Sequence, residues 1–198
     1  MNSKIDSSYK AWSLFLDRDG VINERIIDGY VCNWDDFRFL PGVPEALAVL
    51  SEWFGRIVIV TNQQGVGKGL MTEDELELIH KKMQEEVKRA GGRIDAIYYC
   101  PHLESVQSSC RKPAIDMGMA ARRRFPEISF RKSLMVGDAP SDMVFAKRLG
   151  MKRVFVDNGD PNAQPGEAGC QCRVPSLNGL VQLLQAGNMP EQWSDDGA

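Results

Sequence analysis

The stretch Leu14-Phe15-Leu16-Asp17-Arg18-Asp19-Gly20 joins three apolar residues to two acids spaced i, i+2, and a glycine follows them directly. The apolar run is typical of a buried strand, and the acids would emerge at its C-terminal end. The glycine allows the chain to turn away at once. Burying a carboxylate without a partner costs several kcal/mol. These seven residues alone leave two interpretations open: a strand exit with solvated acids, or a site that holds a cation.

The composition is that of an ordinary globular protein, with 198 residues, 43% hydrophobic and 26% charged. This length predicts a single domain over residues 1–198, with a frayed tail from about residue 187. The net charge of -3 and pI near 5.5 argue against a nucleic-acid or anionic-membrane partner. No run approaches the roughly 18 apolar residues of a membrane span. Residues 1–10 lack the apolar core of a signal peptide, so we expect a cytoplasmic protein. We also expect this protein to be a monomer.

The cysteines are odd in number and unevenly spread along the chain. They are Cys32, Cys100, Cys110, Cys170 and Cys172. In a reducing compartment this pattern predicts free thiols or metal ligands rather than a disulfide framework. Cys170 and Cys172 fit a short terminal strand, in which they would act as small apolar side chains.

Apolar strand patterns alternate with helical patterns along the chain. The strand patterns cover residues 14–16, 56–60, 94–99, 133–136 and 153–156, and the helical patterns cover residues 43–54, 72–90, 115–124, 141–150 and 177–184. Thr72 and Glu75 form a capping box at the start of the longest helix, and Ser141 is a candidate cap for another. This alternation predicts an α/β fold of three layers, Rossmann-like, with a parallel sheet covered on both faces.

Polar side chains follow the C-terminal ends of four predicted strands. Open parallel sheets bind ligands outside these ends, where the strand order switches. The residues concerned are Asp17, Asp19, Thr61, Asn62, Lys112 and Asp138. Some have a plain structural interpretation, such as a helix cap for Asp138 and a solvated loop lysine for Lys112. Their common position at one edge of the sheet favours a ligand site.

The chemistry of these groups points to phosphoryl transfer. The carboxylates of Asp17, Asp19 and Asp138 suit a hard divalent ion such as Mg²⁺, which takes carboxylates, waters and a substrate phosphate. The Thr61 hydroxyl and the Lys112 charge suit phosphoryl oxygens. Asp17 is then placed to attack phosphorus and form an aspartyl-phosphate. Asp19 is placed to protonate the leaving oxygen and afterwards to activate water.

These motifs resemble those of the haloacid dehalogenase superfamily of phosphatases. The matching segments are Asp17-Arg18-Asp19-Gly20-Val21, Thr61 after an apolar strand, Lys112, and Gly137-Asp138 with Asp142 behind it. The resemblance implies Mg²⁺, an aspartyl nucleophile and the strand order 5-4-1-2-3 with the first strand central. It also implies that the side chains of Asp17 and Asp138 and the carbonyl of Asp19 hold the metal. The short segments between the motifs leave room only for a minimal cap.

Within that superfamily, residues 12–157 are similar to the branch of heptose bisphosphate and histidinol-phosphate phosphatases. The shared motifs are Thr61-Asn62-Gln63, Tyr98-Tyr99-Cys100-Pro101-His102 and Cys110-Arg111-Lys112-Pro113. The branch implies a small sugar phosphate bound by Asp28, Gly29, Tyr30, Asn62, Gln63, Gln64 and Arg111. We expect a Mg²⁺-dependent phosphatase acting on the 7-phosphate of heptose 1,7-bisphosphate. Histidinol phosphate is the alternative substrate, and a non-catalytic sugar-phosphate-binding protein is the alternative of another class.

The chain departs from this branch at a metal loop and beside the fourth motif. The branch implies a structural zinc site with four ligands, of which Cys100, His102 and Cys110 match three. Ser108 takes the fourth place, where a hydroxyl is a poor substitute for a thiolate. We therefore expect this loop to hold zinc weakly or not at all. Ala139 stands where the branch often has lysine or arginine, so a phosphate-binding cation is missing.

Two residues outside the motifs have plain interpretations. Lys68 lies in a glycine-rich loop and is a candidate replacement for the missing cation, but a solvated lysine fits its polar surroundings better. His80 lies within a charged helix, so we expect it at the surface.

Overall fold

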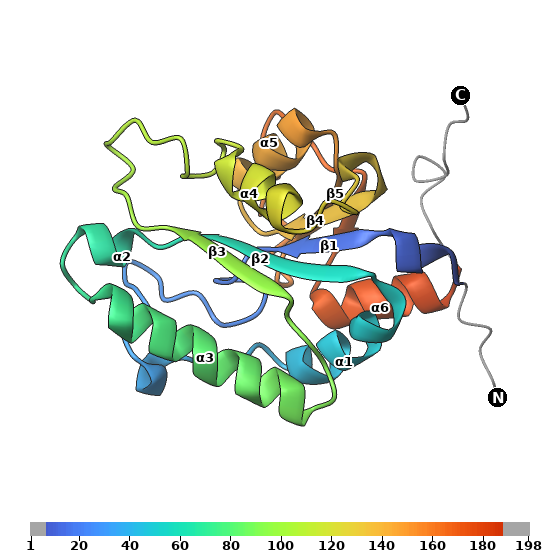
Figure 1. The fold of residues 1–198 in the computed structure, drawn as a ribbon, viewed down its shortest axis with the longest axis horizontal. Helices are drawn as coiled ribbons and strands as arrows, with labels where there is room; N and C mark the ends of the chain where they lie inside the picture. The colour runs from blue at the N-terminus through green and yellow to red at the C-terminus, as the bar shows by residue number, and fades with distance from the viewer. Residues whose placement is uncertain (1–6, 188–198) are drawn as a thin grey trace.

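The computed structural model describes residues 7–187, which form a parallel sheet between two layers of helices (Figure 1). The six strands lie in the order β3-β2-β1-β4-β5-β6. Their bounds are β1 Ser13–Leu16, β2 Arg56–Asn62, β3 Ala96–Cys100, β4 Ser133–Gly137, β5 Lys152–Val156 and β6 Cys172–Val174. The predicted α/β class and central first strand are confirmed. The predicted order lacked a strand, because β6 pairs in parallel with β5 and extends the sheet.

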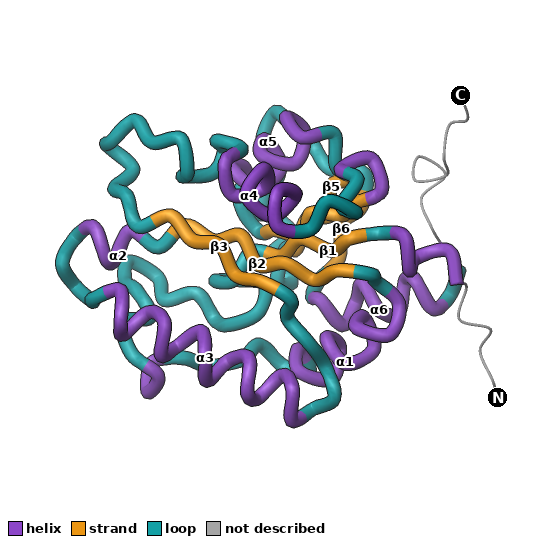
Figure 2. The backbone as a smooth tube through the Cα atoms, viewed as in Figure 1, coloured by secondary structure: helices purple, strands orange, loops and turns teal. Residues whose placement is uncertain are grey.

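Helices cover both faces of the sheet (Figures 1 and 2). One face carries α1 Val43–Trp53, α3 Glu73–Arg89 and α6 Leu177–Gln185, and the other carries α4 Asp116–Arg124 and α5 Pro140–Leu149. Shorter elements are α2 Gln64–Gly67 and the 3₁₀ helices Ser7–Ala11, Trp34–Asp36 and Phe130–Lys132. The helix α2 lies in the stretch that the sequence predicts to be a polar loop after β2.

The central strand explains why the acids lie at the sheet edge. Leu14, Phe15 and Leu16 have no exposed surface. Leu14 and Leu16 belong to the apolar cluster that includes α1, α3 and α6, whereas Phe15 belongs to the cluster that includes α4 and α5. Successive side chains of a strand point to opposite faces, so apolar residues are needed at every position. The first charged residue, Asp17, is therefore placed just past the end of β1.

Helix starts follow local hydrogen bonding. The predicted capping box of α3 is confirmed, because the Glu75 amide donates to the Thr72 hydroxyl (3.2 Å) and the Thr72 amide donates to the Glu75 carboxylate (2.7 Å). The prediction of Ser141 as the cap of α5 is wrong. That helix begins at Pro140, whose fixed φ suits a first helical position.

The rest of the described chain bears on two further expectations. Among residues 7–187, no helix combines the length and the apolar character needed to cross a membrane. The frayed tail predicted from about residue 187 lies, apart from Gly187, outside the described residues.

Candidate active site

The turn after β1 passes directly beside the loop after β4. The Asp17 amide donates to the Val136 carbonyl at 2.9 Å, which holds the two strand ends together. Gly20 has φ +88°, and a Cβ built there would lie 1.9 Å from Oδ2 of Asp138. Only glycine combines this left-handed backbone with so close an approach. The first motif therefore has glycine at position 20 because Asp138 occupies the space beside it.

Lys112 is buried between two carboxylates. Its Nζ lies 2.9 Å from Oδ1 of Asp17 and 2.6 Å from Oδ1 of Asp142. Burial disfavours the lysine charge, but the carboxylates of Asp142 and Asp17 outweigh this effect and raise the pKa of Lys112. Asn62 fixes the backbone of Lys112, since it accepts from the Lys112 amide (2.9 Å) and donates to the Lys112 carbonyl (3.1 Å). Asn62 at the end of β2 thus holds the backbone of Lys112, and the Lys112 side chain contacts Asp17 of the first motif.

The acidic groups form a cluster with the composition of a magnesium site. Carboxylate oxygens of Asp17, Asp138 and Asp142 all lie within 4.8 Å of one another. Burial and then the Asp17 charge raise the pKa of Asp138 to about 8. Burial likewise raises the pKa of Asp142 to about 6, against the opposing effect of Lys112. Such crowding indicates that the cluster needs positive charge beyond that of Lys112.

A second cation already lies against this cluster. Nη2 of Arg25 donates to Oδ1 of Asp138 at 2.7 Å and to the carbonyl of Asp19 at 3.4 Å. These are two of the groups that the resemblance to the superfamily implies as magnesium ligands. The residues present therefore fit a divalent ion, and a guanidinium nitrogen marks where positive charge is favourable. No motif in the sequence pointed to Arg25, because its contact spans 113 positions of the chain.

Asp19 is fixed by two side chains of its own turn and by one side chain that follows β2. Nη2 of Arg18 donates to both of its carboxylate oxygens (2.9 and 3.0 Å), Gln63 donates at 2.7 Å and Asn23 at 2.9 Å. Burial opposes ionisation, but Arg18 and these hydrogen bonds outweigh it and lower the pKa of Asp19. Gln63 also donates to the buried Thr61 hydroxyl at 2.9 Å. Asp19 is therefore held ionised beside Thr61.

His80 was expected at the surface, and that prediction is wrong. The residue is only 6% exposed, and its Nε2 lies 3.3 Å from Nη1 of Arg18. Burial, followed by the Arg18 charge, lowers the pKa of His80 to about 3. The imidazole is therefore neutral and packs beside the arginine that orients Asp19. The helical pattern missed this role because Arg18 is itself fully buried, which is rare for arginine.

The predicted substrate residues line one pocket with a volume of about 590 Å³. Its walls include Asp28, Gly29, Tyr30, Asn62, Gln63, Gln64 and Arg111, together with Asp17, Asp19, Thr61 and Lys112. The Gln64 amide donates to the Tyr30 hydroxyl at 3.0 Å, which joins the first loop to α2. Lys68 also lines this pocket, with Nζ 5.0 Å from the centre of the Tyr30 ring. Four chain segments thus surround the nucleophile candidate, around residues 25–31, 61–68, 104–112 and 139–141.

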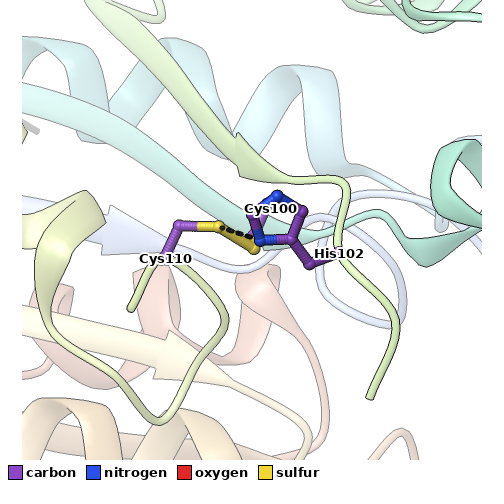
Figure 3. A group of neighbouring side chains, drawn as sticks. All are labelled: Cys100, His102 and Cys110. Carbon is purple, nitrogen blue, oxygen red and sulfur yellow. Dashed lines mark hydrogen bonds between the residues drawn. A yellow bond between two sulfur atoms is a disulfide. The ribbon is translucent and has the colours of Figure 1, made fainter. Parts of the chain in front are cut away.

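The loop between β3 and Lys112 brings the predicted zinc residues together, but with a covalent link. Cys100 and Cys110 form a disulfide, so the prediction that these two are free thiols or metal ligands is wrong for this structure (Figure 3). The loop folds back until their Cα atoms are 5.4 Å apart. Ser108 Oγ lies 2.7 Å from Nδ1 of His102 and 3.2 Å from Sγ of Cys110. The Ser108 hydroxyl therefore lies beside both His102 and Cys110, where the resemblance implies the fourth zinc ligand.

Comparisons with known proteins identify relatives over nearly the whole chain. The HAD-hydrolase-like family model matches residues 109–173. A D-glycero-alpha-D-manno-heptose-1,7-bisphosphate 7-phosphatase of Mycobacterium tuberculosis (strain ATCC 25618 / H37Rv) is 44% identical over 138 residues, which cover 70% of this chain and 73% of that protein. A D-glycero-beta-D-manno-heptose-1,7-bisphosphate 7-phosphatase of Escherichia coli (strain K12) is 35% identical over 91% of this chain and 97% of its own length.

A solved structure of a related phosphatase is similar in fold to this chain. The D,D-heptose 1,7-bisphosphate phosphatase of B. bronchiseptica, solved with magnesium and phosphate, superposes with a TM-score of 0.76 at 31% identity. The match covers 88% of this chain and 99% of that structure.

Proposed function

Because the chain belongs to the HAD-like phosphatases, we propose that it removes the 7-phosphate of D-glycero-D-manno-heptose 1,7-bisphosphate through an aspartyl-phosphate on Asp17. The observation that carries this proposal is the position of buried Lys112, which lies 2.9 Å from the Asp17 carboxylate. A fixed cation beside a carboxylate suits a nucleophile that must approach an anionic phosphoryl group.

The first chemical step uses Asp17 as the nucleophile. One carboxylate oxygen attacks phosphorus, and the bond from phosphorus to the sugar oxygen breaks. Lys112 offsets the charge on the phosphoryl oxygens and keeps its place through Asp142. The buried Thr61 hydroxyl lies in the same pocket and is available to donate to a phosphoryl oxygen. The leaving sugar oxygen takes a proton from Asp19. Asp19 must first take up this proton from solvent, because its contacts with Arg18 and Gln63 favour the ionised form.

The second step hydrolyses the aspartyl-phosphate. Water attacks phosphorus, Asp19 accepts its proton, and inorganic phosphate and the Asp17 carboxylate are released. The contacts of Asp19 with Arg18 and Gln63 favour the ionised form that this step requires. Asp19 thus acts as a general acid in the first step, where it gives up a proton, and as a general base in the second step, where it accepts one.

Mg²⁺ is the proposed cofactor, with the carboxylates of Asp17 and Asp138 and the carbonyl of Asp19 as its protein ligands. When bound, the ion supplies charge neutralisation for the phosphate as it approaches Asp17. The clustering of the Asp17, Asp138 and Asp142 oxygens supports this assignment.

The pocket supports a small, doubly phosphorylated sugar. Arg111 and Lys68 line the pocket wall. Arg111 pairs with exposed Glu104 at 3.6 Å and Lys68 lies over the Tyr30 ring, and we propose that both turn to a second phosphate or to sugar hydroxyls when substrate binds. Their positive charges offset the loss of a cation at Ala139. The relatives named for the alpha anomer are 44% identical, against 35–38% for those named for the beta anomer, which supports the alpha anomer as the preferred substrate.

The proposal is tested by initial rates of phosphate release in the presence of Mg²⁺. The substrates are the two anomers of the heptose bisphosphate, histidinol phosphate and fructose 1,6-bisphosphate. We expect the alpha heptose bisphosphate to give the highest kcat/KM and Asp17→Asn to abolish release from every substrate. A preference for histidinol phosphate by orders of magnitude would instead assign the alternative substrate. Equal turnover by Asp17→Asn would exclude the proposed nucleophile.

The loop that ends at Cys110 is proposed to keep its shape without tightly bound zinc. The disulfide between Cys100 and Cys110 closes it, and Ser108 supplies a hydroxyl where the family places a thiolate. Elemental analysis of protein purified without chelators tests this proposal, since one zinc per chain would contradict it.

A further inference from the structure

Arg25 takes part in no step of the proposed reaction, yet it contacts the proposed metal site. Its Nη2 lies 2.7 Å from Oδ1 of Asp138 in an ion pair, and 3.4 Å from the carbonyl oxygen of Asp19. The Asp138 side chain is only 8% exposed, whereas the Arg25 side chain is 49% exposed. The arginine thus reaches from the solvent side of the pocket to a buried carboxylate.

The backbone before Arg25 is held by hydrogen bonds, which fix the point from which its side chain extends to Asp138. The amide of Glu24 donates to the Arg38 carbonyl at 2.9 Å. Buried Asn23 donates to the Glu24 carbonyl at 2.8 Å and to Asp19 at 2.9 Å. The residue before Arg25 is therefore fixed to the first motif, while the residues from 24 to 28 are exposed. A long side chain on a fixed base can release its contact without unfolding the loop.

The charge balance explains why the guanidinium is held there. Three carboxylates, those of Asp17, Asp138 and Asp142, meet within 4.8 Å. When all three are ionised, buried Lys112 neutralises one unit of their charge. Arg25 supplies a second unit. A divalent ion bound to Asp138 and to the Asp19 carbonyl would supply two units and would need the same oxygens at about 2.1 Å. Two cations on the same pair of oxygens repel each other.

We infer that Arg25 is a tethered cation that occupies the metal-binding oxygens in the metal-free protein, and that Mg²⁺ must displace it. This inference rests on the proposed magnesium site. The apparent affinity for Mg²⁺ then equals the intrinsic affinity multiplied by the fraction of molecules in which Arg25 is not bound to Asp138. Arg25 also lines the wall of the substrate pocket. The arginine thereby keeps the acidic cluster neutralised until the metal arrives.

Calorimetric titration of metal-free protein with MgCl₂, without substrate, tests the inference. We expect Arg25→Gln to bind Mg²⁺ about tenfold more tightly than the unmodified protein, because the competing cation is gone. Arg38→Gln is the matched control. It removes the same charge from the same loop region. The Arg38 guanidinium donates to the Phe37 carbonyl, and Arg38 is not among the residues that line the pocket. Its Kd should stay within twofold of the unmodified value.

The outcomes separate the inference from the proposed function. Equal or weaker Mg²⁺ binding by Arg25→Gln overturns the competition by Arg25 and leaves the metal site standing. The same tightening in Arg38→Gln also overturns it, because the effect would then be one of general charge. If Asp138→Asn binds Mg²⁺ as tightly as the unmodified protein, the proposed metal site itself is wrong. As a second readout, the thermal midpoint of metal-free Arg25→Gln should fall, since Asp138 loses its ion pair.

Discussion

Ser108→Cys should turn the loop between β3 and Lys112 into a zinc site. The Ser108 hydroxyl oxygen lies 2.7 Å from Nδ1 of His102, 3.2 Å from Sγ of Cys110 and 3.5 Å from Sγ of Cys100. Ligand atoms around tetrahedral zinc are separated by about 3.8 Å when the Zn–S bond is about 2.3 Å. A sulfur in place of this oxygen would lie beside all three other ligand atoms, and a Cys₃His set could form once the Cys100–Cys110 bond is reduced and its two sulfurs move apart.

The size of the effect follows from the number of ligands. A structural zinc site with four ligands binds zinc with about 10–16 kcal/mol, so an even share for one ligand is roughly 2.5–4 kcal/mol. We therefore expect reduced Ser108→Cys to bind zinc about 10²–10³-fold more tightly than the reduced unmodified protein. Reduction is required in both cases, because the sulfurs of the Cys100–Cys110 disulfide are not thiolates.

The assay is competition for zinc against a chromophoric chelator, with elemental analysis for stoichiometry. Ser109→Cys is the matched control, since it adds a thiol at the neighbouring, exposed position. Its zinc affinity should stay close to that of the unmodified protein. Equal affinities for Ser108→Cys and the unmodified protein would refute the assignment of residue 108 as the fourth ligand position. A tightly bound zinc in the unmodified protein would refute the argument from the missing thiolate.

Three further perturbations test the fold around the site. Lys112→Met should lower the free energy of unfolding, measured in urea, by about 3–5 kcal/mol, because it leaves two buried carboxylates unpaired. The control Lys68→Met, at an exposed position, should change this free energy by less than about 0.5 kcal/mol. Gly20→Ala should abolish Mg²⁺ binding, since the added Cβ would lie 1.9 Å from Oδ2 of Asp138, a proposed metal ligand. The control Gly42→Ala, at a position with φ +72° and open space around it, should lower the free energy of unfolding by about 1 kcal/mol and leave Mg²⁺ binding unchanged. His80 has a pKa of about 3 when folded and 6.5 when unfolded, so the unfolded chain alone takes up a proton between these values. Stability should therefore fall by up to about 1.4 kcal/mol per pH unit below 6.5, and His80→Gln should flatten this slope in urea titrations from pH 7 to 4.5.

The sequence by itself determined the layered fold and the chemical candidates. The unbroken apolar run Leu14 to Leu16 requires burial on both faces, which makes its strand central and its acids terminal. Polar groups at the ends of parallel strands must then meet at one edge. For this reason Asp17, Lys112 and Asp138 could be assigned to one site from local patterns alone.

Only the tertiary structure decided which charges balance one another. The contact of Arg25 with Asp138 and that of Arg18 with His80 join residues 113 and 62 positions apart, and neither follows a local period. The pairing of Cys100 with Cys110 depends on how a loop without regular structure folds back. Interactions of this kind depend on distance in space and on burial, whereas sequence patterns report the hydrogen bonding and apolar spacing of one element at a time.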